Sequence, residues 1–110
     1  MFHSQLPAVD AVSVPADGFL LDVRENGEWA AGHARDALHI PMGEVVSRIA
    51  EVPDGRRVHV VCRVGGRSAQ VAQYLIAQGV DAVNVDGGML GWEAAGRPLV
   101  SDNDGPAFVL

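Results

Sequence analysis

The sequence contains no lysine and only one cysteine, and each shortage argues against a class of protein. All eight basic residues are arginines against fourteen acidic residues, so the formal charge is −6. This balance disfavours binding to nucleic acid through a basic face. The single cysteine, Cys62, cannot form a disulfide within the chain or a zinc site built from several thiolates. A single cysteine also favours a reducing compartment.

Long apolar stretches are also missing. No run approaches the ~18–20 residues that a membrane span requires. Residues 1–10 have neither the basic start nor the apolar core of a signal peptide. We therefore expect a cytoplasmic protein that binds no membrane and no nucleic acid.

The length and composition indicate one globular domain. A chain of 110 residues with 48% hydrophobic and 20% charged residues can form one core without disulfides or a metal. We place this domain at residues 1–100. Residues 101–110 are acidic and then apolar, so they form either a disordered tail or a flap that docks Phe108 and Leu110.

Alternating strand and helix patterns predict an α/β fold with a mainly parallel central sheet flanked by helices. Short apolar runs predict strands at 19–23, 57–61 and 82–85. Helical spacing predicts helices at 25–31, 43–50, 68–78 and 89–95. In the third of these helices, Ser68 is expected to be the N-terminal cap and Gly79 the left-handed stop.

Residues 58–68 join a buried strand, Cys62, a glycine-containing turn and the start of a helix. Ligands of open parallel sheets bind at the carboxyl ends of the strands, where Cys62 is expected. Amides of the helix N-terminus, and of a nest formed at Gly65 and Gly66, would stabilise a thiolate there. Half ionisation near pH 7 needs a pKa decrease of about 1.5 units, or about 2 kcal/mol. One or two charge-assisted hydrogen bonds supply that amount.

Each of these residues also has a purely structural interpretation. Cys62 could be a small buried hydrophobic residue at the end of a strand. Arg63 could bind an anion or be a solvated surface side chain. Arg67 could pair with a carboxylate and hold the loop, and we expect it to combine this role with binding.

The loop Cys62-Arg63-Val64-Gly65-Gly66-Arg67-Ser68 resembles the Cys-x-x-Gly-x-Arg-Ser active-site loop of single-domain rhodaneses. Upstream, Leu-Asp-Val-Arg-Glu at 21–25, Glu-Trp at 28–29, Gly-His at 32–33 and Ala-Leu-His-Ile-Pro at 37–41 are similar to the upstream motif of that family. Downstream, Asp-Gly-Gly-Met at 86–89 and Gly-Trp at 91–92 are similar to its downstream motif. The three motifs occur in order across residues 20–92.

The resemblance implies a three-layer rhodanese-like fold and a sulfurtransferase. Cys62 would attack the sulfane sulfur of thiosulfate, become a persulfide and pass the sulfur to cyanide, a thiol or an acceptor protein. The substrate-binding residues would be Arg63, Val64, Gly65, Gly66, Arg67 and Ser68. A basic residue at the position of Arg63 favours thiosulfate over mercaptopyruvate as the donor. No cofactor and no metal are implied.

The remaining motif residues are expected to support the scaffold. Asp22 would brace the active-site loop as a structural carboxylate, and Arg24 would form a local ion pair with Glu28. His33 and His39 are interpreted as hydrogen-bonded turn residues rather than metal ligands. The two tryptophans are interpreted as core anchors, and the glycine pair at 87–88 as a tight turn.

Two other functions remain open on these residues. Cysteine-dependent phosphatases of the same fold place five residues between cysteine and arginine, whereas four lie between Cys62 and Arg67. The shorter loop forms a tighter ring of amides, which suits one sulfur better than a tetrahedral oxyanion. The chain could also be a relay that takes sulfur from a partner protein and passes it on without turning over thiosulfate.

Overall fold

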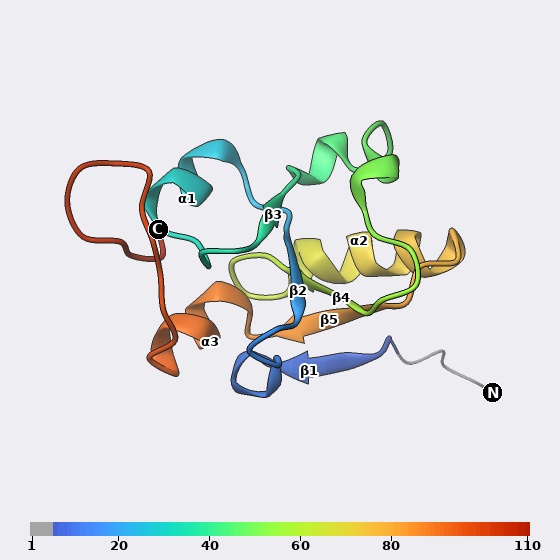
Figure 1. The fold of residues 1–110 in the computed structure, drawn as a ribbon, viewed down its shortest axis with the longest axis horizontal. Helices are drawn as coiled ribbons and strands as arrows, with labels where there is room; N and C mark the ends of the chain where they lie inside the picture. The colour runs from blue at the N-terminus through green and yellow to red at the C-terminus, as the bar shows by residue number, and fades with distance from the viewer. Residues whose placement is uncertain (1–5) are drawn as a thin grey trace.

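The computed structural model describes residues 6–110, so the first five residues of the predicted 1–100 domain lie outside the described part. One sheet has the order β1-β5-β4-β2-β3, and each neighbouring pair is parallel. The strands are β1 (Ala8–Asp10), β2 (Phe19–Asp22), β3 (Leu38–His39), β4 (Val58–Val61) and β5 (Ala82–Asp86). The helices are α1 (Asn26–Ala31), α2 (Gly66–Ala77) and α3 (Gly88–Ala94). The predicted α/β class with a parallel sheet is confirmed (Figure 1).

Helices cover both faces of the sheet and enclose two apolar clusters. On one face Leu75 of α2 packs in the same cluster as Val58 and Val60 of β4. On the other face Met89 and Trp92 of α3 pack with neighbouring strand residues. Burying each large apolar side chain of this kind contributes about 1.5–3 kcal/mol. The central strands are therefore packed between helices on both faces of the sheet.

The two outer strands were not predicted from the sequence. β1 has three residues and β3 has two, which is too short for an alternating or continuous apolar pattern to be recognised. Both lie at the edges of the sheet, where they form hydrogen bonds with one neighbour only. The three predicted strands are the central ones, which are buried on both faces and carry the strongest apolar signal.

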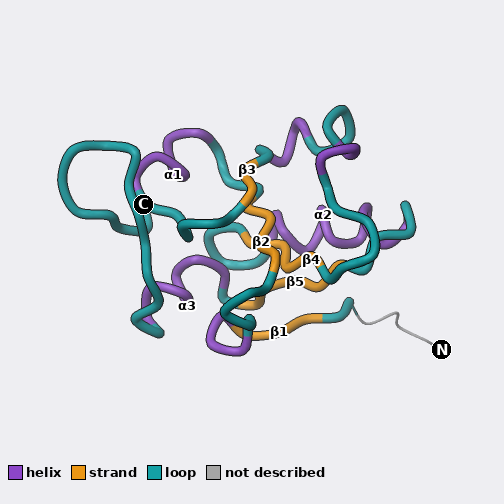
Figure 2. The backbone as a smooth tube through the Cα atoms, in the orientation of Figure 1, coloured by secondary structure: helices purple, strands orange, loops and turns teal. Residues whose placement is uncertain are grey.

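The predicted helix at 43–50 is wrong. That stretch forms two short 3₁₀ turns, Met42–Glu44 and Ile49–Glu51, connected by further turns (Figure 2). Val45 is buried and Val46 is 66% exposed, so the neighbouring apolar residues do not share one face. Pro53 disfavours helical geometry in the residue before it, and Val52 is indeed extended where the stretch ends.

The segment 101–110 packs along α1 and α3. The Phe108 amide donates to the Ala31 carbonyl at 3.1 Å, and the Val109 amide donates to Glu93 at 2.9 Å. Val109 is 9% exposed, whereas Phe108 and Leu110 are about half exposed. The segment therefore docks through Val109 and its backbone, and the expectation that Phe108 and Leu110 would be the docked side chains is wrong. Within residues 6–110, no helix is long and apolar enough to cross a membrane.

Candidate active site

Cys62 follows directly after β4 at the carboxyl end of the sheet, as predicted. β4 carries it into the interior, where it is 1% exposed. The next residues turn back over the sulfur, and α2 begins at Gly66. The cysteine therefore lies at the base of a short loop, between the end of a strand and the start of a twelve-residue helix.

Hydrogen-bond donors surround the sulfur of Cys62. The Gly65 amide donates to Sγ at 3.1 Å, and the Ser68 hydroxyl donates to it at 3.2 Å. Burial alone would raise the pKa of the thiol, but the bonds from the Ser68 hydroxyl and from the Ser68, Gly65 and Val64 amides outweigh burial. The pKa of Cys62 is therefore below that of an ordinary cysteine, which favours a reactive thiolate.

Ser68 contributes in a different way from the one predicted. α2 begins two residues earlier than expected, with Gly65 as its N-terminal cap, so Ser68 lies within the first turn. There its side chain is fully buried and its hydroxyl points at Cys62 rather than capping the helix backbone. The predicted stop at Gly79 is confirmed by its φ of 87°.

Only one of the two loop glycines needs an unusual backbone conformation. Gly65 has φ 116°, in the left-handed region that favours glycine, and this turn directs its amide toward Cys62. Gly66 belongs to α2, and a side chain there would meet open space. Of the two glycines, only Gly65 therefore has the unusual backbone angles expected of a nest.

The start of α3 forms hydrogen bonds with the backbone of the active-site loop. The Met89 amide donates to the Cys62 carbonyl at 2.8 Å, and the Leu90 amide donates to the Arg63 carbonyl at 3.1 Å. Gly88 allows this approach, because a Cβ at that position would collide with both carbonyl oxygens. The glycine pair at 87–88 forms the predicted tight turn and also creates a docking surface for the active-site loop.

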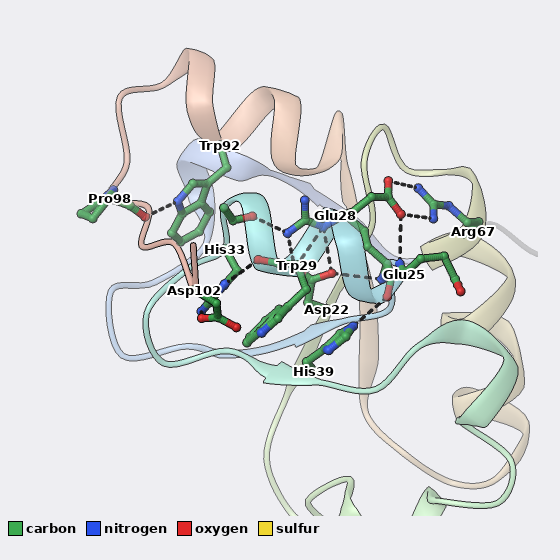
Figure 3. A network of polar contacts seen from close by, with 12 residues as sticks. Asp22, Glu25, Glu28, Trp29, His33, His39, Arg67, Trp92, Pro98 and Asp102 are labelled. Atoms are coloured by element: carbon green, nitrogen blue, oxygen red, sulfur yellow. Dashed lines mark hydrogen bonds and ion pairs between the residues drawn. The ribbon is translucent and has the colours of Figure 1, made fainter. Parts of the chain in front are cut away.

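Arg67 forms a two-pronged ion pair with Glu28 of α1, at 2.7 and 2.9 Å (Figure 3). The side-chain hydrogen bond from Arg67 is the main cause that lowers the pKa of Glu28 to about 2. Glu28 also accepts the Glu25 amide in the capping box that starts α1. The expectation that Arg67 pairs with a carboxylate is therefore confirmed, and its binding role stays a prediction.

Asp22 and Arg24 pair with each other rather than with the loop. Both are fully buried, and Arg24 donates to the Asp22 carboxylate through Nε and Nη2, the shortest contact being 2.7 Å. Arg24 also donates to the Gly32 carbonyl at 2.7 Å, which fixes the end of α1. The predicted Arg24–Glu28 pair is wrong, because Arg24 pairs with the buried Asp22 and Glu28 forms a two-bond pair with Arg67.

Arg63 and Val64 lie at the exposed mouth of the loop. Arg63 Nε donates to the carbonyl oxygen of Leu110 at 3.0 Å, so the segment 101–110 reaches the active-site loop. Val64 is 54% exposed, and its amide faces Cys62. Val64 thus combines an outward side chain with an amide that faces the sulfur.

His33, His39 and Trp29 form a stack beside α1. Trp29 stacks between the two imidazole rings with centroid distances of 3.6 and 4.6 Å (Figure 3). His33 bonds the Trp29 carbonyl and His39 bonds the Arg24 carbonyl, which confirms both as hydrogen-bonded residues.

Trp92 is buried as predicted, whereas Trp29 is only partly buried. Within residues 6–110, no group of three or more His, Cys, Asp or Glu side chains could hold a metal ion.

Comparisons with known proteins agree with this arrangement. The family model described as "Rhodanese-like domain" matches residues 8–95. A sulfurtransferase of Allochromatium vinosum is 41% identical over 86 residues, which cover 77% of this chain and 80% of that protein. The thiosulfate sulfurtransferase GlpE of Actinobacillus pleuropneumoniae is 37% identical over 81 residues, covering 73% and 75% of the two chains.

A solved structure shows the same architecture. The rhodanese-related protein of Thermoplasma volcanium is 28% identical and aligns with a TM-score of 0.81, over 86% of this chain and 97% of that one. Together the relatives support sulfurtransferase activity in general. With its parallel sheet, its strand-cysteine-loop-helix site and a family match over most of its length, the chain belongs to the rhodanese-like domain family.

Proposed function

We propose that the chain transfers a sulfane sulfur from an anionic donor such as thiosulfate to a thiophilic acceptor, through a persulfide on Cys62. The observation that carries this proposal is the set of donors around Sγ, namely the Ser68 hydroxyl and the amides of Val64, Gly65 and Ser68. They lower the pKa of the thiol and so favour the thiolate, which is the nucleophile that the reaction requires.

The first step is a displacement at sulfur. The Cys62 thiolate attacks the outer sulfur of thiosulfate, and a new S–S bond forms as the S–S bond of the donor breaks. The electron pair of the broken bond leaves with sulfite. The product on the enzyme is an anionic persulfide, so charge is conserved and no external oxidant or reductant is needed.

The second step returns the enzyme to its starting state. An acceptor thiolate or cyanide attacks the outer sulfur of the persulfide, and the bond to Cys62 breaks with its electron pair remaining on Sγ. The outer sulfur lies ~2.05 Å beyond Sγ. There the amides of Gly66 and Arg67, which a helix start leaves without intrahelical partners, can share its charge.

Arg63 supports the choice of an anionic donor. Its side chain is exposed at the mouth of the loop, and the Leu110 carbonyl engages only its Nε. The guanidinium can therefore attract a doubly charged donor to a protein whose overall charge is −6. This is the residue through which we propose that thiosulfate is preferred over a larger keto-acid donor.

Intact-mass spectrometry tests the proposal directly. Incubation with thiosulfate should add the mass of one sulfur atom, dithiothreitol should remove it, and Cys62→Ser should remain unmodified. An aryl phosphate serves as the comparison substrate and should not be turned over. If thiosulfate adds no sulfur but a persulfidated protein does, the chain is a relay. If neither adds sulfur, the sulfurtransferase proposal fails.

A further inference from the structure

Asn84 is a buried polar residue that no motif singled out. It lies in β5, is 4% exposed and pairs in register with Val60 of β4 and Ala8 of β1. A central strand position of this kind normally holds an apolar side chain. The amide therefore calls for an explanation in terms of what it contacts.

The contacts of Asn84 fix its orientation. Its Nδ2 donates to the Gly65 carbonyl at 3.2 Å and to Asp86 Oδ1 at 3.0 Å. Both partners are acceptors, so only the NH₂ side of the amide can face them. Its Oδ1 is buried without a partner in the described part of the chain, an arrangement that an apolar residue would avoid.

The bond to Gly65 determines where the next amide points. In a trans peptide the C=O and the following N–H point in opposite directions. The Gly65 carbonyl is the first of α2 and accepts the Ala69 amide, so the Gly66 amide points out of the helix start. Holding this peptide also holds Gly65 at φ 116°, the conformation in which its own amide donates to Sγ.

The same principle applies to the two carbonyls that α3 holds. The Arg63 carbonyl accepts the Leu90 amide, and the amide of the same peptide, that of Val64, faces Cys62. At Arg63, a carbonyl held outside the loop thus accompanies an amide that faces the sulfur. Asn84 holds its carbonyl through a side-chain amide, whereas α3 holds the other two carbonyls through backbone amides.

We propose that Asn84 is a positioning residue, which orients the Gly65 peptide so that the loop amides face the sulfur of Cys62. The inference rests on the proposed function only in taking Cys62 as the reactive group. It assigns to β5 a part in the reaction that neither the loop motif nor the glycine pair reveals.

The test measures the thiolate itself and needs no sulfur transfer. The rate of Cys62 alkylation by iodoacetamide is recorded against pH for the wild-type chain, Asn84→Ala and Asn84→Val. Val83→Ala is the matched control, because it removes a buried side chain from the same strand without touching the loop. The charges near the loop, on Arg63, Arg67, Glu28 and Asp86, are the same in all variants.

We expect the alkylation midpoint to move to higher pH in both Asn84 variants, with alkylation at pH 7 slower by about two- to tenfold. Val83→Ala should keep the wild-type midpoint even if it unfolds more easily. The β-branched Asn84→Val fills the site in a strand and gives a folded comparison if Asn84→Ala is unstable. A wild-type midpoint in either folded Asn84 variant would overturn the proposal. A shifted midpoint in a chain that accepts no sulfur would sink the sulfurtransferase proposal alone.

Discussion

Glu28→Gln removes one charge from the ion pair that joins α1 to the active-site loop. Glutamine keeps an acceptor oxygen for the Glu25 amide, so the capping box at the start of α1 can survive. The substitution therefore isolates the charge that faces Arg67. We expect it to reduce both the stability of the fold and the rate of sulfur transfer, because the pair holds the loop against α1.

The structure sets the magnitude between two limits. Exposed ion pairs contribute about 0–1 kcal/mol, whereas removing one partner of a fully buried pair costs about 3–5 kcal/mol. Here the Glu28 side chain is 17% exposed and that of Arg67 is 33% exposed, and two short bonds join them. After allowance for solvent screening, we expect a coupling of about 1–2 kcal/mol in a double-mutant cycle with Arg67→Ala.

The pH dependence of this contribution has a definite sign. The pKa of Glu28 is about 2 in the folded protein against 4.5 for an ordinary glutamate, so the folded state favours the charged form. The stabilisation is fully present above pH 4.5 and is lost as the pH falls through about 2. The stability difference between wild type and Glu28→Gln should therefore be constant from pH 7 to 4.5 and shrink below it.

Urea denaturation at a series of pH values measures this difference. The exposed pair between Glu44 and Arg48 is the matched control, because it has a similar N–O distance of 2.9 Å at the surface. Glu44→Gln should change stability by no more than about 0.5 kcal/mol. If Glu28→Gln has an equally small effect, or if its effect does not shrink below pH 4.5, the pair does not hold the loop.

The other predictions concern the backbone and the thiol. Gly65→Val should nearly abolish transfer, because φ 116° is strained for a β-branched residue, whereas Gly66→Ala should retain activity; steady-state rates distinguish them. Gly88→Ala should destabilise the fold by about 1–3 kcal/mol and slow transfer, since its Cβ would collide with the loop carbonyls; thermal melts and rates check this. Gly32→Ala should displace the segment 101–110, because its Cβ would collide with the Phe108 backbone, and faster proteolysis of that segment would reveal it. Alkylation of Cys62 should reach half of its maximal rate at a pH below ~8.5, the ordinary pKa of cysteine. A midpoint at or above that pH contradicts the hydrogen bonds assigned to the sulfur.

The sequence was most informative where the interactions are local. The central strands, the position of Cys62 at a strand end and the turn at Gly65 follow from apolar runs and from the proximity of glycine to the start of a helix. Each of these features depends on residues within a few positions of one another. Backbone amides near the sulfur are likewise a property of one short stretch, so they could be predicted without knowledge of the rest of the chain.

Interactions between distant segments could not be predicted in the same way. Arg24 has carboxylates at positions 22 and 28, and helical spacing alone favoured Glu28. In the fold Arg24 is fully buried just before α1 and pairs with Asp22, which is fully buried as well. Glu28 is thereby left for Arg67, which is 39 positions away.

Asn84 was missed for a related reason. The other residues of the predicted strand 82–85 are apolar, and the partner of Asn84, Gly65, is 19 positions away. A polar residue inside a central strand is the one sequence signal that could have identified it, because burying an amide costs free energy unless it is hydrogen-bonded. Such positions in predicted strands are therefore good candidates for contacts to a neighbouring active-site loop.

The loop is fixed from three directions, and this arrangement suits a reaction that places a charge on sulfur in both of its states. Glu28 holds Arg67 from α1, the amides of Met89 and Leu90 hold two carbonyls from α3, and Asn84 holds a third from β5. Because the amides are already oriented, a thiolate and an anionic persulfide can be stabilised without reorganising the loop. A flexible loop of the same sequence would lose part of this stabilisation to the entropy of ordering its peptides. Sulfur transfer should therefore be more sensitive to the three anchors than to the exposed side chain of Val64 at the mouth of the loop.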